Sequence, residues 1–171
     1  ELGIHRMVSD GIIEALVELT RTADDETTRY AIAALCRICG NEENAELITT
    51  SGAVQQMVSE AITGAELTKQ FCAAAISALS LYENCRVKLT EHGVVPALKA
   101  LSDLNDDATK HRCLVAFGNL SCEPAVQKSL VDQSIVQIIA ELTNSYHETN
   151  QICCAKALCN LACNEDSRLQ I

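Results

Sequence analysis

Apolar and polar positions along this chain repeat with a constant period. A six-residue pattern, in which a small residue is followed by two apolar residues and a third apolar residue comes three places later, occurs four times. The four copies are Gly11–Leu16, Gly52–Met57, Gly93–Leu98 and Ser134–Ile139, and they are evenly spaced with no insertion between them. The period is about 41 residues, within the range of roughly 20–50 residues that is typical of proteins built from stacked repeats.

Further columns keep the same spacing across the whole unit. One column is always Ala, the next is a large apolar residue, and two later columns are also apolar. These columns contain Ala34, Ala75, Ala116 and Ala157; Leu35, Ile76, Phe117 and Leu158; Ile38, Leu79, Leu120 and Leu161; and Ile48, Leu89, Leu130 and Ile171. Such coincidence without a gap shows that the repeat is real.

Each unit contains three helical signals, of which the first two are separated by a Gly. The first is short and spans residues 44–50 in one copy, with Ala45 and Ile48 apolar. In a later copy it opens at Pro124, a residue suited to a first helical turn. The second helix is predicted over residues 94–104, where one stripe is formed by Val94, Val95, Leu98 and Leu101.

The turns on either side of the second helix have their own signals. Gly11, Gly52 and Gly93 precede it, where a sharp turn requires a small residue or a positive φ. Acidic residues at 24–26 and 106–107 precede the third helix, as expected for N-terminal capping and for interaction with the helix dipole. In the first unit this helix has its apolar stripe at Ala31, Ala34, Leu35 and Ile38.

One three-helix unit of this size cannot bury its own apolar faces, whereas stacked units bury them against each other. The pattern therefore predicts an all-α solenoid that forms a single domain over residues 1–171. We expect about four repeats with clipped ends, at approximately 1–40, 41–81, 82–122 and 123–163, and the start of a further repeat at 164–171. The sequence indicates a segment of a longer array of repeats.

Composition supports a buried core and indicates the cellular compartment. Apolar residues make up 48% of the chain and aromatic residues only 3%. Ten cysteines, nine of them in strongly apolar helical stretches, are interpreted as small buried hydrophobic residues in a reducing compartment rather than as disulfides or a zinc site. Cys36 and Cys39 form one C-x-x-C pair, with no second pair at suitable spacing. A cytoplasmic location follows, with nuclear or cytoskeletal association as alternatives.

Net charge excludes several kinds of partner. The formal charge is −10, and a field of that sign repels nucleic-acid phosphates and anionic lipid. The longest stretch without a charged residue, Gly or Pro, residues 70–82, is far shorter than the roughly 20 apolar residues that a membrane-spanning helix requires. Phosphate-binding loops, nucleophile elbows and H-E-x-x-H stretches do not occur. We therefore expect no enzyme activity, cofactor, metal, nucleic-acid partner or membrane insertion.

The units resemble armadillo repeats. The similarity rests on Gly93–Leu98 for the second helix and on Ala116–Leu120 and Ala157–Leu161 for the third, of which the last is close to the family's Ala-Leu-Ser-Asn-Leu signature. HEAT repeats, with two helices per unit, are the nearest alternative. The resemblance covers nearly the whole chain. It implies a right-handed superhelix whose third helices line a concave groove that binds extended or helical segments of partner proteins.

The resemblance also points to groove residues. In many members an Asn of the third helix hydrogen-bonds the backbone of a bound peptide, and the matching positions are Asn119 and Asn160. The same column contains Arg37 and Ala78, so the Asn ladder is broken. Import adaptors of the family have a Trp four residues earlier, which is absent here. Two interpretations stay open for the two Asn residues, namely peptide anchors or ties between neighbouring helices.

Cations and an aromatic residue complete the candidate groove. Positive charge there suits an acidic partner segment, whereas a solvated helix face is the alternative, favoured for Arg29 and Arg112. Tyr30 and Phe71 share one column and are interpreted as groove anchors or as partly buried packing residues. The candidate partner-binding residues are Asn119, Asn160, Arg37, Lys156, Arg112, His111, Arg29 and Tyr30.

The sequence thus predicts a non-catalytic protein–protein interaction module, a scaffold or adaptor that binds a protein or peptide segment along the groove. Two alternatives stay open. The array could be the substrate-recognition part of a larger enzyme such as a ubiquitin ligase, or a structural spacer in a cytoskeletal or axonemal assembly. Uncapped terminal repeats are also expected to promote oligomerisation.

Overall fold

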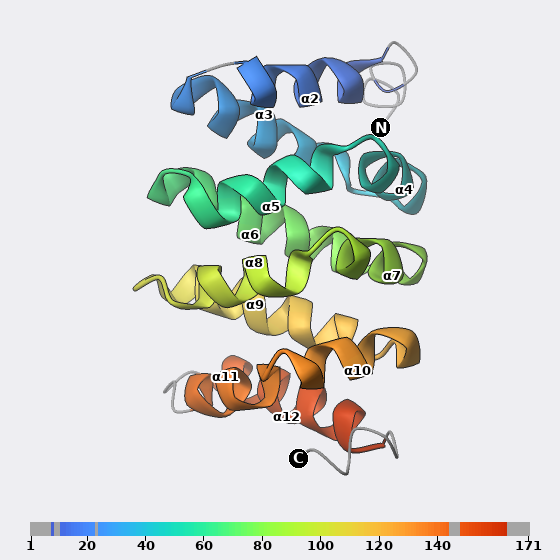
Figure 1. Ribbon diagram of the computed structural model, residues 1–171, viewed down its shortest axis with the longest axis vertical. Helices are drawn as coiled ribbons and strands as arrows, with labels where there is room; N and C mark the ends of the chain where they lie inside the picture. Colours follow the sequence, from blue (N-terminus) through green and yellow to red (C-terminus); the bar gives the residue numbers. More distant parts are fainter. Residues whose placement is uncertain (1–7, 9–10, 23, 144–147, 164–171) are drawn as a thin grey trace.

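Eleven helices, and no strand, are found in the described residues 8, 11–22, 24–143 and 148–163 of the computed structural model (Figure 1). The short first helices are α4 (Glu42–Thr50), α7 (Glu83–Glu91) and α10 (Pro124–Asp132). The second helices are α2 (Ile12–Thr22), α5 (Ala53–Thr63), α8 (Val94–Ser102) and α11 (Ile135–Leu142). The third helices are α3 (Asp25–Ile38), α6 (Glu66–Ser80), α9 (Asp107–Leu120) and α12 (Glu148–Cys163). The predicted all-α class is confirmed.

Helices of the same kind stack on one another along the molecule. α3, α6, α9 and α12 pack side by side in sequence order, α2, α5, α8 and α11 do the same, and α4, α7 and α10 form a third row. In Figure 1 the first helices lie along one edge, the second helices in front and the third helices behind. Neighbours along each row are one repeat period apart in sequence, so the repeat unit becomes one layer of the solenoid. Residues 164–171, the expected start of a further repeat, lie outside the described residues.

The helix boundaries follow local capping. Asn41 accepts a hydrogen bond from the backbone N–H of Asn44 at 2.9 Å, so α4 begins at Glu42, two residues before the predicted start. Asp24 and Asp106 cap α3 and α9 in the same way, as the acidic residues predicted. The second helix of the third unit ends at Ser102 and not at residue 104, because the chain turns there and the N–H of Leu104 donates to the carbonyl of Leu101.

The repeat columns form one continuous core. All four residues of the stripe predicted in α8 are buried, as are Ala45 and Ile48 of α4. Phe117 has the largest of the fully buried side chains. Ala34 is half-buried, whereas the other three alanines of its column are fully buried. The core therefore runs through successive layers and depends on contacts between them.

Each first helix also donates a hydrogen bond to the C-terminal end of the third helix before it. A side chain in the first helix donates to a backbone carbonyl six residues earlier: Asn44 to Ile38 at 2.9 Å, Arg86 to Ser80 at 3.1 Å and Gln127 to Ser121 at 2.8 Å. The last carbonyls of a helix have no partner within it. These bonds satisfy such carbonyls at the corner between the two helices.

The turn before each second helix requires a left-handed backbone. Gly11, Gly52 and Gly93 have φ of 83°, 90° and 83°, as the sequence predicted, and Ser134 has φ of 60° in the fourth copy. A Cβ atom in this region costs roughly 1–2 kcal/mol. A Cβ atom added at position 93 would meet only the Val58 side chain, at 3.8 Å. Backbone strain is therefore the main cost of a larger residue there.

We expect Gly93→Ala to lower the free energy of unfolding by about 1–2 kcal/mol, because Ala disfavours a positive φ. Ser134→Gly is the matched change in the opposite direction and should stabilise the chain by up to about 1 kcal/mol. Urea unfolding followed by circular dichroism measures both. Equal effects of the same sign would contradict the strain argument.

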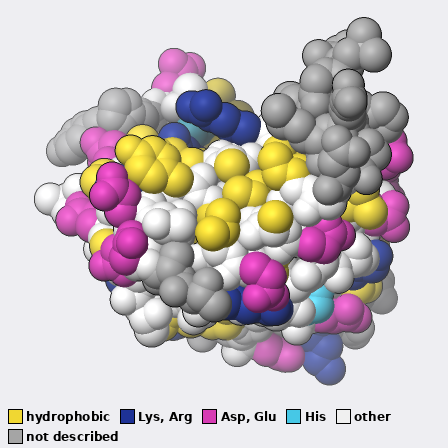
Figure 2. Space-filling view, turned by 90° about the horizontal axis from the view of Figure 1, so that it is seen from above, with side chains coloured by type: hydrophobic (Ala, Val, Ile, Leu, Met, Phe, Trp, Pro, Cys, Tyr) yellow, Lys and Arg dark blue, Asp and Glu magenta, His cyan; other side chains and the backbone are white. Residues whose placement is uncertain are grey.

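Hydrophobic side chains gather on the end of the stack formed by α2 and α3 (Figure 2). In α2, Ile12 and Leu16 are half-buried and Leu19 is exposed. The positions of Leu16 in the later copies, Met57 and Leu98, are fully buried by the layer before them. The outer surface of α2 therefore corresponds to the stacking surface that, in each inner layer, is covered by the layer before it. The expected oligomerisation through such ends stays a prediction.

Candidate functional site

Four columns of the repeat place side chains on one surface of the third helices. Because these helices pack side by side in the same register, residues one repeat period apart lie next to each other across the layers. We call this surface the third-helix face. It is formed by Arg29, Gln70, His111 and Ile152; Tyr30, Phe71, Arg112 and Cys153; Ala33, Ala74, Val115 and Lys156; and Arg37, Ala78, Asn119 and Asn160. It contains all eight candidate residues predicted from the sequence.

Charge is segregated along the third helices. In the described ranges of α3, α6, α9 and α12, every acidic residue is the first or second residue of its helix: Asp25, Glu26, Glu66, Asp107 and Glu148. Every charged residue beyond the second position is basic: Arg29, Arg37, Lys69, Lys110, Arg112 and Lys156. Acidic first turns suit the helix dipole. The rest of these helices is therefore positive in a chain whose net charge is −10.

Large apolar side chains are exposed among these cations. Tyr30 is 63% exposed, Ile152 61% and Phe71 38%, and Leu67 near the start of α6 is also exposed. Of the two interpretations left open for Tyr30, partly buried packing is wrong, although Arg112 and Cys153 of the same column are half-buried. Burying such side chains under a ligand would remove apolar area from water, worth roughly 25 cal/mol per Å².

The two Asn residues of the third-helix face bond the preceding layer. The amide nitrogen of Asn119 donates to the hydroxyl of Ser80 at 3.1 Å, and that of Asn160 donates to the hydroxyl of Ser121 at 3.1 Å. Asn119 is only 8% exposed, whereas Asn160 is half-buried. Of the two interpretations left open by the sequence, these contacts favour a tie between helices. Each contact uses one of the two N–H groups that the Asn amide could otherwise donate to a peptide carbonyl.

Arg29 is held by its neighbours on α3. Its guanidinium lies 3.5 Å from the Glu26 carboxylate and 5.0 Å from the centre of the Tyr30 ring. A cleft of about 390 Å³ lies beside it, between the first turns of α3 and α6, lined by Asp25, Glu26, Arg29, Ala65, Glu66, Leu67 and Thr68. The acidic first turns thus meet the basic part of the face at this cleft.

The other predicted cations differ in how far they are engaged. Arg112 reaches across to α6 and donates to the backbone carbonyl of Gln70 at 3.3 Å, and His111 lies 2.8 Å from the Asn150 side chain through its Nδ1 atom. Arg37 and Lys156 are exposed and form no ion pair with any described residue. These two are the cations best placed to meet a charged ligand.

Some residues that form the face or bond to it were not predicted. Ser80 and Ser121 accept the hydrogen bonds that Asn119 and Asn160 donate. The two Ser residues occupy one column of the repeat, and this shared column was the signal that could have predicted the pairing. Ile152 was also missed, because its helix has no clear apolar stripe to distinguish a buried from an exposed apolar residue.

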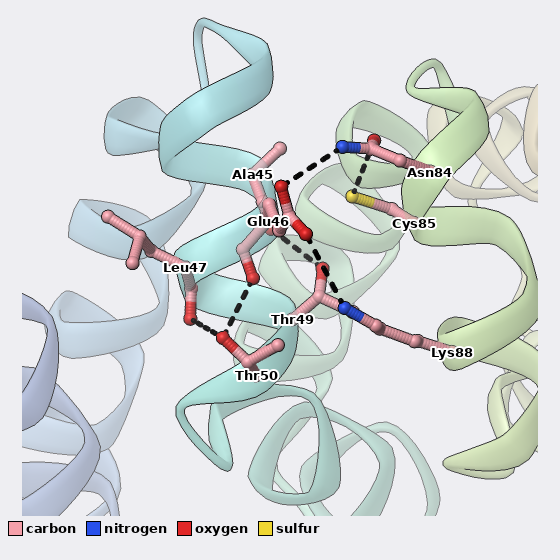
Figure 3. A network of polar contacts seen from close by, with 8 residues as sticks. All are labelled: Ala45, Glu46, Leu47, Thr49, Thr50, Asn84, Cys85 and Lys88. Atoms are coloured by element: carbon pink, nitrogen blue, oxygen red, sulfur yellow. Dashed lines mark hydrogen bonds and ion pairs between the residues drawn. The ribbon is translucent and has the colours of Figure 1, made fainter.

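A second polar network lies away from this face, where α4 meets α7 (Figure 3). Glu46 accepts from the Asn84 amide at 3.4 Å and lies 3.6 Å from the Lys88 ammonium. Glu46 is exposed and Lys88 is half-buried, and ion pairs open to solvent in this way contribute little stability. The network is a contact between first helices and contains no residue of the third-helix face.

All ten cysteines are free, but their environments are not uniform. The interpretation as buried hydrophobic residues is wrong for Cys122, Cys159 and Cys163, which are exposed. Cys122 and Cys163 share a column that is exposed in all four copies, whereas Cys159 occupies the column of the half-buried Cys36 and lies in the last described layer. Cys36 and Cys153 are half-buried and the other five are buried. Within the described part of the chain, no group of three His, Cys, Asp or Glu residues is arranged to hold a metal ion.

Comparisons with known proteins identify the fold. The sequence matches no family model and no curated protein. Among solved structures, a computationally designed armadillo repeat protein for modular peptide recognition matches 97% of this chain and 71% of its own, with TM-score 0.90 and 21% identity. A designed armadillo repeat protein in complex with the peptide (KR)4 matches 98% of this chain and 72% of its own, with TM-score 0.88 and 20% identity.

An engineered protein is also similar, with TM-score 0.85 and 24% identity over 92% of this chain, which spans 39% of that protein's length. No described helix combines the length and apolar character needed to cross a membrane. Stacked layers of three helices, a left-handed turn before each second helix and these structural matches agree with one another. The chain therefore has an armadillo-like repeat fold.

Proposed function

We propose that this chain is a non-catalytic interaction module that binds an extended acidic peptide segment along the third-helix face. The observation that carries the proposal is the charge segregation of the third helices, which places only cations beyond their first turns. Because a bound acidic segment would meet Arg37 and Lys156 without displacing an existing ion pair, both charges are available to it. Charge complementarity of this kind favours encounter and selects among partners.

Exposed apolar side chains supply the second part of the recognition. Tyr30 and Phe71 lie on neighbouring helices in one column, and Ile152 extends the apolar surface to α12. Successive side chains of an extended peptide point to opposite sides. An extended peptide that meets both the cations and the apolar side chains therefore needs acidic and large apolar residues on the same side, at alternate positions of its sequence.

The size of the face sets the length of the ligand. Packed helices lie about 8–10 Å apart, so four third helices span roughly 27 Å between the first and last axes. An extended chain advances about 3.3 Å per residue, so a peptide of about nine residues covers this span. A similar structure contains a bound (KR)4 peptide, which shows that the fold can hold a peptide. The cations of the present face favour the opposite ligand charge.

The test compares three labelled nine-residue peptides by fluorescence anisotropy. In each peptide Ser fills the even positions, while Leu and one variable residue take turns at the odd positions and so share one side. The variable residue is Glu in the first peptide, Lys in the second and Gln in the third. We expect the Glu peptide to bind about tenfold more tightly than the Lys peptide, because exposed ion pairs at two cations, at about 0.7 kcal/mol each, together contribute about 1.4 kcal/mol. The difference should shrink at high salt. Tighter binding of the Lys peptide, or equal binding of all three, would refute the proposal.

A further inference from the structure

The last turn of α3 brings two thiols together. Cys36 is half-buried and lies three residues before Cys39, which is buried and caps the helix. The Cys39 sulfur donates to the backbone carbonyl of Cys36 at 2.9 Å. Residues three apart in a helix have Cα atoms about 5 Å apart, within the range of roughly 4.4–6.8 Å found in disulfides. The Cα separation is therefore compatible with a disulfide, and closing the bond requires the two Cβ atoms, about 5–6 Å apart at this helical spacing, to approach to about 4 Å.

Other layers have the same local geometry without the two thiols. In α6 the Ser80 hydroxyl donates to the Ser77 carbonyl at 2.7 Å, and after α9 the Ser121 hydroxyl donates to the Gly118 carbonyl at 2.9 Å. These residues occupy the columns of Cys36 and Cys39. The helix-end hydrogen bond thus needs only a small donor, and the layer of α3 is distinguished by having a thiol at both positions.

The surroundings of Cys36 favour its thiolate. A hydrogen bond from the Cys39 thiol is the main cause that lowers the pKa of Cys36, and the charges of Arg112 and Arg37 lower it further against the effect of burial, to about 7. The C-terminal end of a helix is a poor site for an anion. The two guanidinium groups offset this effect. The pKa of Cys39 is raised, chiefly by the same hydrogen bond and then by burial, with Cys85 of α7 contributing.

We propose that Cys36 and Cys39 form a redox-active dithiol, in which Cys36 is oxidised by a hydroperoxide and Cys39 then closes an intrachain disulfide. In the first step the Cys36 thiolate attacks one peroxide oxygen. An S–O bond forms, the O–O bond breaks, and the released hydroxide takes a proton to become water. Cys36 is then a sulfenic acid, oxidised by two electrons.

In the second step the Cys39 sulfur attacks the Cys36 sulfur. The S–S bond forms, the S–O bond breaks, and the departing hydroxide takes the Cys39 proton to leave as water. The hydrogen bond to a Cys36 thiolate, the main cause of the raised Cys39 pKa, ends once Cys36 is oxidised. Oxidation of the first thiol therefore releases the second for attack.

Tryptic mass spectrometry reads this bond directly. Cleavage after Arg29, Arg37 and Lys69 places Cys36 alone in the peptide 30–37 and Cys39 alone in the peptide 38–69. After treatment of the reduced full chain with one equivalent of hydrogen peroxide, we expect these two peptides to be joined by a disulfide and separated again by dithiothreitol. A disulfide of Cys39 with Cys85, or preferential oxidation of the exposed Cys159 and Cys163, would overturn the proposal.

The pH dependence of alkylation tests the role of Cys36 separately. The iodoacetamide labelling rate of Cys36 should be half-maximal near pH 7, at least about one pH unit below that of a short unstructured cysteine peptide. The midpoint does not depend on how accessible the thiol is. A midpoint equal to that of the peptide would refute a nucleophilic Cys36.

Variants separate the chemistry from folding. The double variant Cys36→Ser, Cys39→Ser reproduces the pair found at Ser77 and Ser80, so it should fold and lose the disulfide. Cys36→Ser alone should leave Cys39 unoxidised at the same peroxide dose. Rapid oxidation of Cys39 in that variant would show that Cys36 is not the attacking thiol. None of these readouts uses a peptide ligand, so the result is independent of the proposed function.

Discussion

Replacing Phe117 with Ala is expected to cost about 3–5 kcal/mol of unfolding free energy, because its ring is the largest of the fully buried side chains among the described residues. Phe117 is fully buried in the middle of α9 and belongs to the continuous core. The substitution removes the transfer free energy of the ring and leaves a cavity that neighbouring helices fill only in part. In a solenoid the loss also weakens the contact between layers.

Urea unfolding followed by circular dichroism measures this effect. With a slope of about 2 kcal/mol per M, the midpoint should fall by roughly 1.5–2.5 M. Phe117→Leu keeps most of the apolar volume and should lose much less. Leu158→Ala removes a half-buried residue from the same column and should also have a smaller effect. Equal shifts in all three variants would contradict the argument from burial.

Reversing the charges of Arg37 and Lys156, the two cations of the third-helix face that pair with no described carboxylate, should weaken binding of the acidic peptide about thirtyfold. The double variant Arg37→Glu, Lys156→Glu replaces two attractive contacts by two repulsive ones. At about 1 kcal/mol for each reversed charge, the loss is about 2 kcal/mol, which corresponds to this factor in Kd. Both side chains are exposed, so the fold should be retained, and circular dichroism checks this.

The matched control is the double variant Lys99→Glu, Lys128→Glu. It changes the net charge by the same amount, but its residues lie on α8 and α10, away from the third-helix face, and are also exposed. We expect the control to change the Kd of the Glu peptide less than threefold, which corresponds to about 0.6 kcal/mol. If both double variants weaken binding equally, the net charge of the protein, and not the charge of the third-helix face, determines affinity.

Much of the fold was predictable because the repeat makes every column visible four times. The Gly before each second helix identified a turn that requires positive φ, and Ser134 kept the same backbone in a copy where Gly is replaced. The acidic residues before α3 predicted their capping role. A single unit would have shown neither the stacking nor the shared core.

The site was less predictable because exposure depends on the neighbouring layer. The sequence alone could not separate peptide anchors from helix ties for Asn119, since its bond to Ser80 joins different layers. The exposure of Tyr30 and the clustering of cations depend on which columns face outward. The same limit explains the exposed Cys159, which in sequence resembles the buried cysteines.

The cross-helix bonds of the third-helix face have one property that bears on how such a chain can change in evolution. Each joins residues in adjacent layers, as in Asn119 with Ser80 and Arg112 with Gln70, so each layer depends only on its immediate neighbour. Duplicating one whole unit would therefore supply its own copy of every contact and lengthen the face by one helix. Inserting a few residues within a helix would instead misalign both neighbours. Growth by whole units is thus the change in length that this architecture tolerates best.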